Sequence, residues 1–143
     1  MRARVALADL FVDTLRFNAN RGLVDALRMG VPAVSCAGEN MASRLGGSIV
    51  RAAGLVDCVA DSPAAYAQLV RRLAQDPGAL PALRQQLARA RDSAPLFDMA
   101  ARLREWEWAW AHMVQRHQDG LAPAAFDVPD LSVLQPAAVP VRA

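Results

Sequence analysis

The sequence predicts an α/β fold, and three features near its start carry that prediction. Residues 10–12 are a short apolar run between two aspartates, which is typical of a strand buried on both faces. A turn rich in asparagine and an apolar-patterned helix follow, and this helix ends at Gly30 before Pro32. A second apolar run, residues 31–36, supplies another strand. A strand, a helix and a strand in this order indicate part of a parallel sheet.

A second helix and a third strand are predicted downstream. Apolar side chains recur at helical spacing over residues 41–53, and the run stops at Gly54. Gly46 and Gly47 each weaken a helix by about 1 kcal/mol relative to alanine. Their presence therefore indicates close packing against a strand or a ligand. Residues 56–59 then fit a short edge strand.

Three further helices are predicted in the rest of the chain. Ser62 and Pro63 provide a cap and a first-turn proline for the first of them. The second begins between Pro77 and Pro81 and carries leucines along one side. The third is long and covers residues 99–117, where charged and alanine-rich flanks favour a helix over a strand.

The last helix carries an aromatic stripe with two interpretations. Leu103, Trp106, Trp110 and Met113 lie on one face at helical spacing, and Trp108 lies off it. The tryptophans are either contacts to another domain or to a second copy, left exposed in this chain, or ordinary core residues. The sequence pattern leaves both interpretations open.

Composition bounds the protein to about one domain of 143 residues with a net charge of +2. Its basic residues are all arginines and are scattered, which argues against a nucleic-acid surface. No apolar run is long enough for a membrane span, and no signal peptide is evident, so a cytoplasmic location is expected. Cys36 and Cys58 are interpreted as reduced structural thiols. His112 and His117 lack metal-ligand spacing, so no metal site is expected.

The start of the first helix in the sheet region is the candidate ligand site. In open α/β sheets, ligands bind beyond the carboxyl ends of strands, where free helix N–H groups favour phosphate. A helix beginning near Gly22 places Arg21 beside a pyrophosphate, and Asp25 one turn on can accept hydrogen bonds from a ribose diol. On spacing alone, two alternatives stay open: Asp25 as a carboxylate that only complements the helix dipole, and Arg21 as a solvated surface charge.

Three motifs in order resemble the C-terminal region of protein O-GlcNAc transferases and their bacterial relatives. They read D-T-x-x-x-N-x-x-x-x-x-x-D-A-L-x-x-G-V-P, then G-x-x-x-A-S-R, then S-A-P-L-F-D. The resemblance covers residues 2–113. The matching residues are Asp13, Thr14, Asn18, Asp25, Ala26, Leu27, Gly30, Val31, Pro32, Gly38, Ala42, Ser43, Arg44 and residues 93–98.

This resemblance implies a Rossmann-like glycosyltransferase-B donor domain, of which this chain is the C-terminal part, with packed helices after it. In the family, the aspartate matching Asp25 holds the ribose of a UDP-sugar, and a preceding G-H-T-T turn holds the diphosphate. Here the turn reads Ala19-Asn20-Arg21-Gly22. In the related adhesin N-glycosyltransferases the turn ends N-G-I-I-D, which matches from Gly22 onward, and Arg21 replaces their asparagine. Asn20, Arg21, Gly22 and Asp25 are thus the implied UDP-sugar-binding residues.

The implied function is sugar transfer from UDP to a protein by direct displacement with inversion, without a cofactor or metal. No residue here is assigned as catalytic, because the family's proposed base lies in the other domain. Residues 1–118 are expected to form a partial UDP-sugar-binding domain with a terminal bracing helix, and residues 119–143 a disordered tail rich in proline and alanine. The implied partners are a protein acceptor and either a missing N-terminal catalytic half or a dimer partner at the Trp106/Trp110 helix. The alternatives are a non-catalytic interaction module and an inactive truncated paralogue.

Overall fold

The computed structural model describes residues 2–129 and residue 131. The chain divides into two compact units, Met1–Phe97, called unit 1, and Asp98–Ala143, called unit 2. The predicted boundary at residue 118 differs from this division, because the last helix belongs to unit 2.

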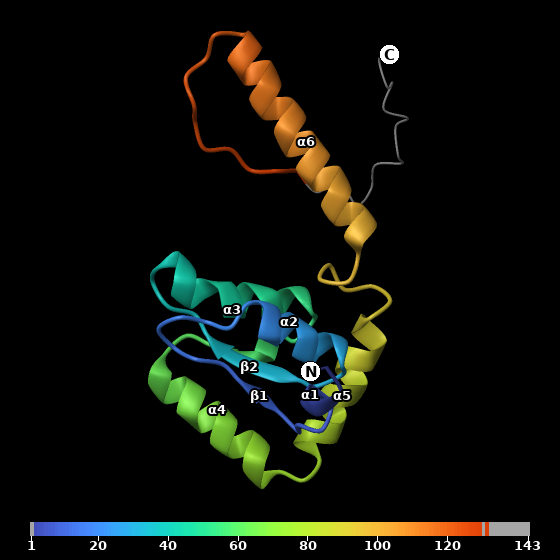
Figure 1. Ribbon diagram of the computed structural model, residues 1–143. Coiled ribbons are helices and arrows are strands. Elements are labelled where there is room, and N and C mark those ends of the chain that lie inside the picture. The colour runs from blue at the N-terminus through green and yellow to red at the C-terminus, as the bar shows by residue number, and fades with distance from the viewer. Residues whose placement is uncertain (1, 130, 132–143) are drawn as a thin grey trace. The chain divides into compact units, whose positions relative to one another are not determined.

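Unit 1 is built on a three-stranded parallel sheet, which confirms the predicted α/β fold (Figure 1). The strands are β1 (Phe11–Val12), β2 (Ala33–Cys36) and β3 (Val59–Ala60), in the order β1-β2-β3. Every residue of the central strand β2 is buried. The predicted edge strand at residues 56–59 is displaced, because Val56–Cys58 form a 3-10 turn that buries the Cys58 side chain.

Helices cover both faces of this sheet. Figure 1 shows α2 and α3 over one face and α4 over the other, and both α3 and α4 contact β2. Their ends follow the sequence signals: the Asn40 side chain accepts a hydrogen bond from the Ser43 N–H, and Ser62 accepts one from the Ala65 N–H. Gly30 has a φ of 79°, as expected after α2. The helices of unit 1 are α1 (Arg2–Val5), α2 (Arg21–Arg28), α3 (Met41–Ala52), α4 (Pro63–Gln75) and α5 (Ala79–Ala90).

The core of unit 1 lies between these helices and the sheet. Each of the helices α2 to α5 contributes leucines, isoleucine, valine or tyrosine to one continuous buried cluster. The third matched motif, residues 93–98, packs against this core through Leu96 and Phe97. The Leu96 N–H donates to the Ala52 carbonyl at the end of α3, over 2.9 Å. The fully buried members with the largest side chains are Leu23, Leu27, Leu55, Leu87, Val34 and Val50.

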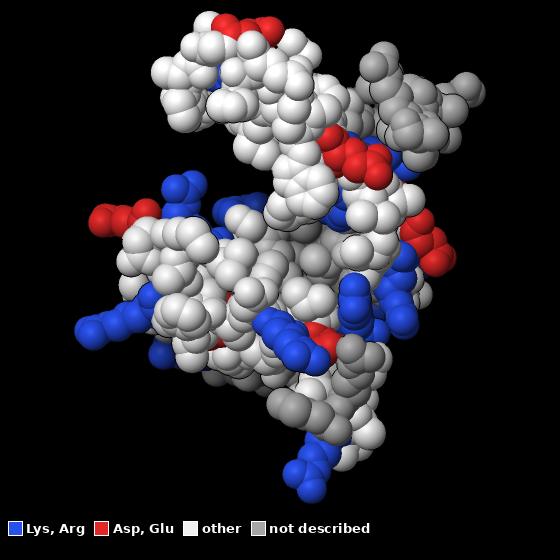
Figure 2. All heavy atoms as spheres, turned by 45° about the horizontal axis from the view of Figure 1, so that its top comes forward, with Lys and Arg blue, Asp and Glu red and all other residues white. Residues whose placement is uncertain are grey.

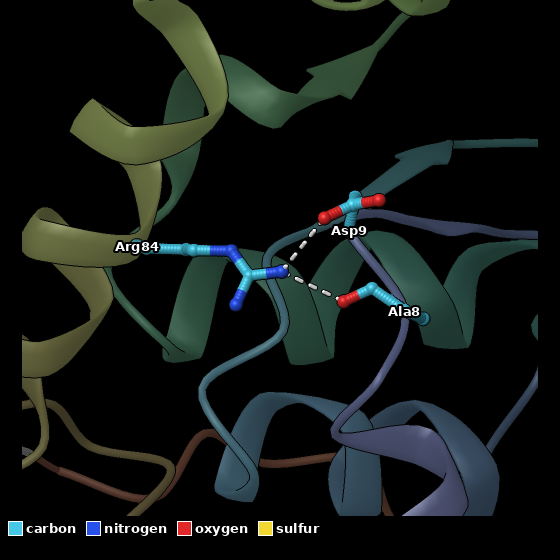
Figure 3. A network of polar contacts seen from close by, with 3 residues as sticks. All are labelled: Ala8, Asp9 and Arg84. Atoms are coloured by element: carbon cyan, nitrogen blue, oxygen red, sulfur yellow. Dashed lines mark hydrogen bonds and ion pairs between the residues drawn. The ribbon is translucent and has the colours of Figure 1, made fainter.

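Helix α5 is tied to the segment that leads into β1 (Figure 3). The Arg84 guanidinium donates to the Ala8 carbonyl over 2.8 Å and lies 3.3 Å from an Asp9 carboxylate oxygen. Both charged groups are solvent-exposed, so the ion pair itself contributes under about 1 kcal/mol. The hydrogen bond to the Ala8 carbonyl gives Arg84 a structural role, because it joins α5 to the segment before β1.

Unit 2 consists of α6 (Met99–Gln118) and the segment after it. Asp98 caps α6 by accepting a hydrogen bond from the Ala101 N–H over 2.8 Å. One face of α6 is covered: Trp108 stacks on His112 at 5.0 Å between ring centroids, and Phe126 lies 4.6 Å from that imidazole.

The other face of α6 is the predicted stripe, and its large side chains are exposed. Trp106 is 60% exposed and Trp110 is 56% exposed, with their rings edge to face at 5.8 Å. The core interpretation of these two side chains is therefore wrong for the described part of the chain. Residues 119–129 contain no helix or strand. Residue 130 and residues 132–143 of the predicted disordered tail lie outside the described residues, so that disorder stays a prediction.

Charge is spread over the surface of the protein. On the face that Figure 2 displays, basic side chains lie at several separate places, and acidic side chains lie among them. Within residues 2–129, no group of three histidine, cysteine or acidic side chains is arranged to hold a metal ion. No helix of the described chain combines the length and apolar character needed to span a membrane.

Candidate functional site

The candidate site begins at the carboxyl end of β1, where Asp13 is buried with only 4% exposure. One carboxylate oxygen accepts a hydrogen bond from the Ser35 hydroxyl of β2 over 2.6 Å. The other accepts from the N–H groups of Thr14, over 2.9 Å, and Ala19, over 2.7 Å. These neutral donors offset the cost of burying the charge, and they fix both ends of the loop that follows β1.

Asn18 fixes the same loop to α3. Its side chain is 1% exposed, accepts a hydrogen bond from the Gly46 N–H over 3.0 Å and donates to the Thr14 carbonyl over 2.6 Å. Its backbone N–H donates to the Ala42 carbonyl over 2.8 Å. A buried amide with both ends paired holds a single loop conformation.

The approach of α3 to this network requires glycine at position 46. A Cβ atom there would lie 2.0 Å from an Asp13 carboxylate oxygen and 2.7 Å from the Ser35 hydroxyl. A Cβ atom at Gly47 would lie 3.1 Å from Val59 of β3. The prediction that these glycines allow close packing is therefore confirmed.

Tyr66 of α4 reaches the network from the other face of the sheet. Its hydroxyl donates to the Asp13 carbonyl over 2.6 Å, and its side chain is buried. Burial first, and then the Asp13 charge, raises the pKa of the Tyr66 hydroxyl to about 12. The hydroxyl thus stays a donor at neutral pH, and α3 and α4 both approach Asp13, the residue that follows β1.

The loop delivers the chain to the amino end of α2, which is open to solvent. The helix begins at Arg21, one residue before the predicted start, and its first backbone bond runs from the Val24 N–H to the Asn20 carbonyl over 3.1 Å. The Asn20 side chain makes no capping hydrogen bond. Asn20, Arg21 and Gly22 are exposed, and a Cβ atom at Gly22 would meet nothing within 4 Å. First-turn N–H groups that are exposed and not capped by a side chain can bind an anion.

Asp25 lies one turn into α2 and is half-buried. Two open hollows of unit 1, of about 470 and 330 Å³, lie along α4 and are lined by neither Asp25 nor the Asn20–Arg21–Gly22 turn. These hollows do not mark the candidate site, which is an exposed helix end. The assignment of the four predicted residues to a UDP-sugar stays a prediction.

The buried network around Asp13 was not predicted from the sequence. In the sequence, Asp13 and Asn18 stand out only as motif matches, and no local pattern assigns Ser35 or Tyr66 to the site. One signal was available, because an aspartate directly after a buried strand lies at the sheet edge where ligands bind.

The sequence matches the model of glycosyl transferase family 41 over residues 2–105. A probable UDP-N-acetylglucosamine–peptide N-acetylglucosaminyltransferase SPINDLY from Oryza sativa subsp. japonica is 35% identical over 119 residues, which is 83% of this chain and 13% of that protein. The UDP-N-acetylglucosamine–peptide N-acetylglucosaminyltransferase of Caenorhabditis elegans is 31% identical over 82% of this chain and 10% of its own length. The chain thus spans about an eighth or less of these relatives.

The fold is similar to a solved structure of the same kind. A mutant of the Thermobaculum terrenum O-GlcNAc transferase superposes with a TM-score of 0.77 and 31% sequence identity. The match covers 85% of this chain and 23% of that one.

Proposed function

Because the chain belongs to glycosyl transferase family 41, we propose that unit 1 binds the donor in a transfer of N-acetylglucosamine from UDP to a protein. The single observation that carries this proposal is the open amide end of α2, delivered by a fixed loop at the carboxyl edge of the sheet. The proposed donor, UDP-N-acetylglucosamine, and the proposed protein acceptor are those that the names of the relatives state.

In this proposal the diphosphate lies against the first-turn N–H groups of α2. Arg21 adds a cation where the family has hydroxyl donors, and that cation stabilises the departing diphosphate. The Asp25 carboxylate accepts hydrogen bonds from the ribose diol. The proposed binding needs no metal, so EDTA is expected to leave the affinity for UDP unchanged. A cytoplasmic location stays part of the proposal, and the free, buried thiols of Cys36 and Cys58 agree with it.

Calorimetric titration of the 143-residue chain with UDP tests the donor site. We expect micromolar-range binding by the wild-type chain. Asp25→Ala is expected to weaken binding at least about tenfold, because hydrogen bonds to a charged group contribute roughly 1.5–3 kcal/mol and 1.4 kcal/mol is tenfold.

The control for this titration is Asp92→Ala, which removes an equally charged side chain from an exposed position beyond α5. It is expected to keep the wild-type affinity. Absence of UDP binding by the wild-type chain would contradict the donor site and favour an inactive paralogue. Equal affinities of the two variants would contradict the role of Asp25 in the site.

A second candidate function rests on the exposed stripe of α6. We propose that Leu103, Trp106 and Trp110, each more than half exposed, form a docking face. Its partner is either a second copy of this chain or the catalytic half that the family resemblance implies. Tryptophans are enriched at the centres of protein interfaces, because they bury a large area with few rotatable bonds.

Sedimentation of the chain over a range of concentrations tests docking between copies. Substituting both Trp106 and Trp110 by alanine is expected to weaken self-association at least about tenfold, because buried tryptophans are frequent interface hot spots. Phe17→Ala removes another exposed aromatic side chain, from unit 1, and is expected to have no effect. A wild-type chain that stays monomeric throughout the range would exclude the second copy as the partner.

A further inference from the structure

We propose that Asp13 is a positioning residue of the donor site, which holds the amide end of α2 in the conformation that binds the diphosphate. This inference rests on the proposed function and deepens it. Asp13 contacts neither Arg21 nor Gly22 through a described hydrogen bond, so its effect passes through the loop backbone. The contact that transmits this effect is the 2.7 Å hydrogen bond from the Ala19 N–H to the carboxylate.

That contact lies two residues before Arg21, the first residue of α2. Ala19 is followed by Asn20, whose carbonyl accepts the first backbone hydrogen bond of the helix from Val24. Fixing the Ala19 N–H therefore fixes the direction in which the chain enters the helix. The loop between Asp13 and Ala19 is closed on itself by the same carboxylate, which also accepts from Thr14.

Asp13 is itself held from three directions. Ser35 of β2 donates to it, Tyr66 of α4 donates to the carbonyl of the same residue, and α3 approaches so closely that Gly46 has no room for a side chain. Asn18 adds a separate connection from the loop to α3. Binding groups are effective when the residues that support them have one conformation, and this loop has few alternatives.

The expected consequence is a change in donor affinity beyond any change in stability. If alanine at position 13 leaves the loop in its binding conformation about one tenth of the time, the apparent Kd for UDP rises about tenfold. Asp13→Asn is expected to restore most of the affinity. Its amide oxygen can accept from Thr14 and Ala19, and its NH2 group can donate to the Ser35 hydroxyl.

The experiment compares three variants of the 143-residue chain: Asp13→Ala, Asp13→Asn and Leu87→Ala. Leu87 is fully buried on α5 outside the proposed site, so its truncation lowers stability without touching the loop. The Kd for UDP is measured where unfolding curves show every variant folded. Amide hydrogen exchange is followed at Ala19 and Val24, relative to core amides of α3 and α4.

We expect Asp13→Ala alone to weaken UDP binding about tenfold and to raise exchange at Ala19 and Val24 at least about tenfold above the core amides. Leu87→Ala should raise exchange throughout unit 1 and leave the Kd unchanged. Unchanged UDP affinity in Asp13→Ala, or exchange at Ala19 and Val24 that rises only with the core, overturns the positioning role. If no variant binds UDP, the proposed function fails, and the exchange at these two amides still decides whether Asp13 holds the helix end.

Discussion

Gly46→Ala is expected to destabilise unit 1 by about 3 kcal/mol, despite the helix propensity that alanine adds. The new Cβ atom would lie 2.0 Å from an Asp13 carboxylate oxygen and 3.0 Å from Cβ of Asn18. Neither neighbour can move freely, because Asp13 and Asn18 are buried and hydrogen-bonded. In a unit of this size the expected loss lowers the thermal midpoint by roughly 10–20 °C, measured by circular dichroism.

Gly22→Ala is the matched control for this substitution. It makes the same change in α2, where a Cβ atom meets nothing within 4 Å, and alanine there is expected to stabilise by up to about 1 kcal/mol. If both variants unfold at the same temperature, the close approach of α3 to the network does not constrain position 46.

Leu27→Ala is the second substitution with a large expected effect. Leu27 is fully buried between α2 and the sheet, and deleting such a side chain costs about 2–5 kcal/mol, through lost transfer free energy and the cavity left behind. Urea unfolding should show a lower midpoint with an unchanged slope, because the surface exposed on unfolding stays nearly the same.

Leu7→Ala makes the same chemical change at a side chain that is 83% exposed. Its free energy of unfolding is expected to stay within about 0.5 kcal/mol of the wild-type value. A similar loss in both variants would contradict the assignment of the Leu27 effect to burial.

Local pattern predicted the helices well, because their signals lie within a few residues of one another. The Ser62 cap and Pro63 mark the start of α4 as the structure has it, and α6 ends one residue after the predicted boundary. The bounds of the short strands were harder to predict from local pattern. Val56 and Cys58 suit a strand, yet residues 56–58 form a turn that buries Cys58, and pairing with β2 begins only at Val59.

The aromatic stripe shows where periodicity stops being informative. The spacing of Trp106 and Trp110 correctly predicted one face, and that of Trp108 correctly predicted another. Which face is covered depended on where the chain returns after α6. Phe126 returns against the Trp108 and His112 side. Nothing in the helix sequence encodes that choice.

The sequence alone determined the strand–helix–strand order, the caps and the motifs that identify the family, because each depends on neighbouring residues. Only the tertiary structure decided what Asp13 does. Its partners Ser35 and Tyr66 are 22 and 53 residues away in the chain. A buried carboxylate needs hydrogen-bond donors, and the packing of the whole core decides which donors lie beside it.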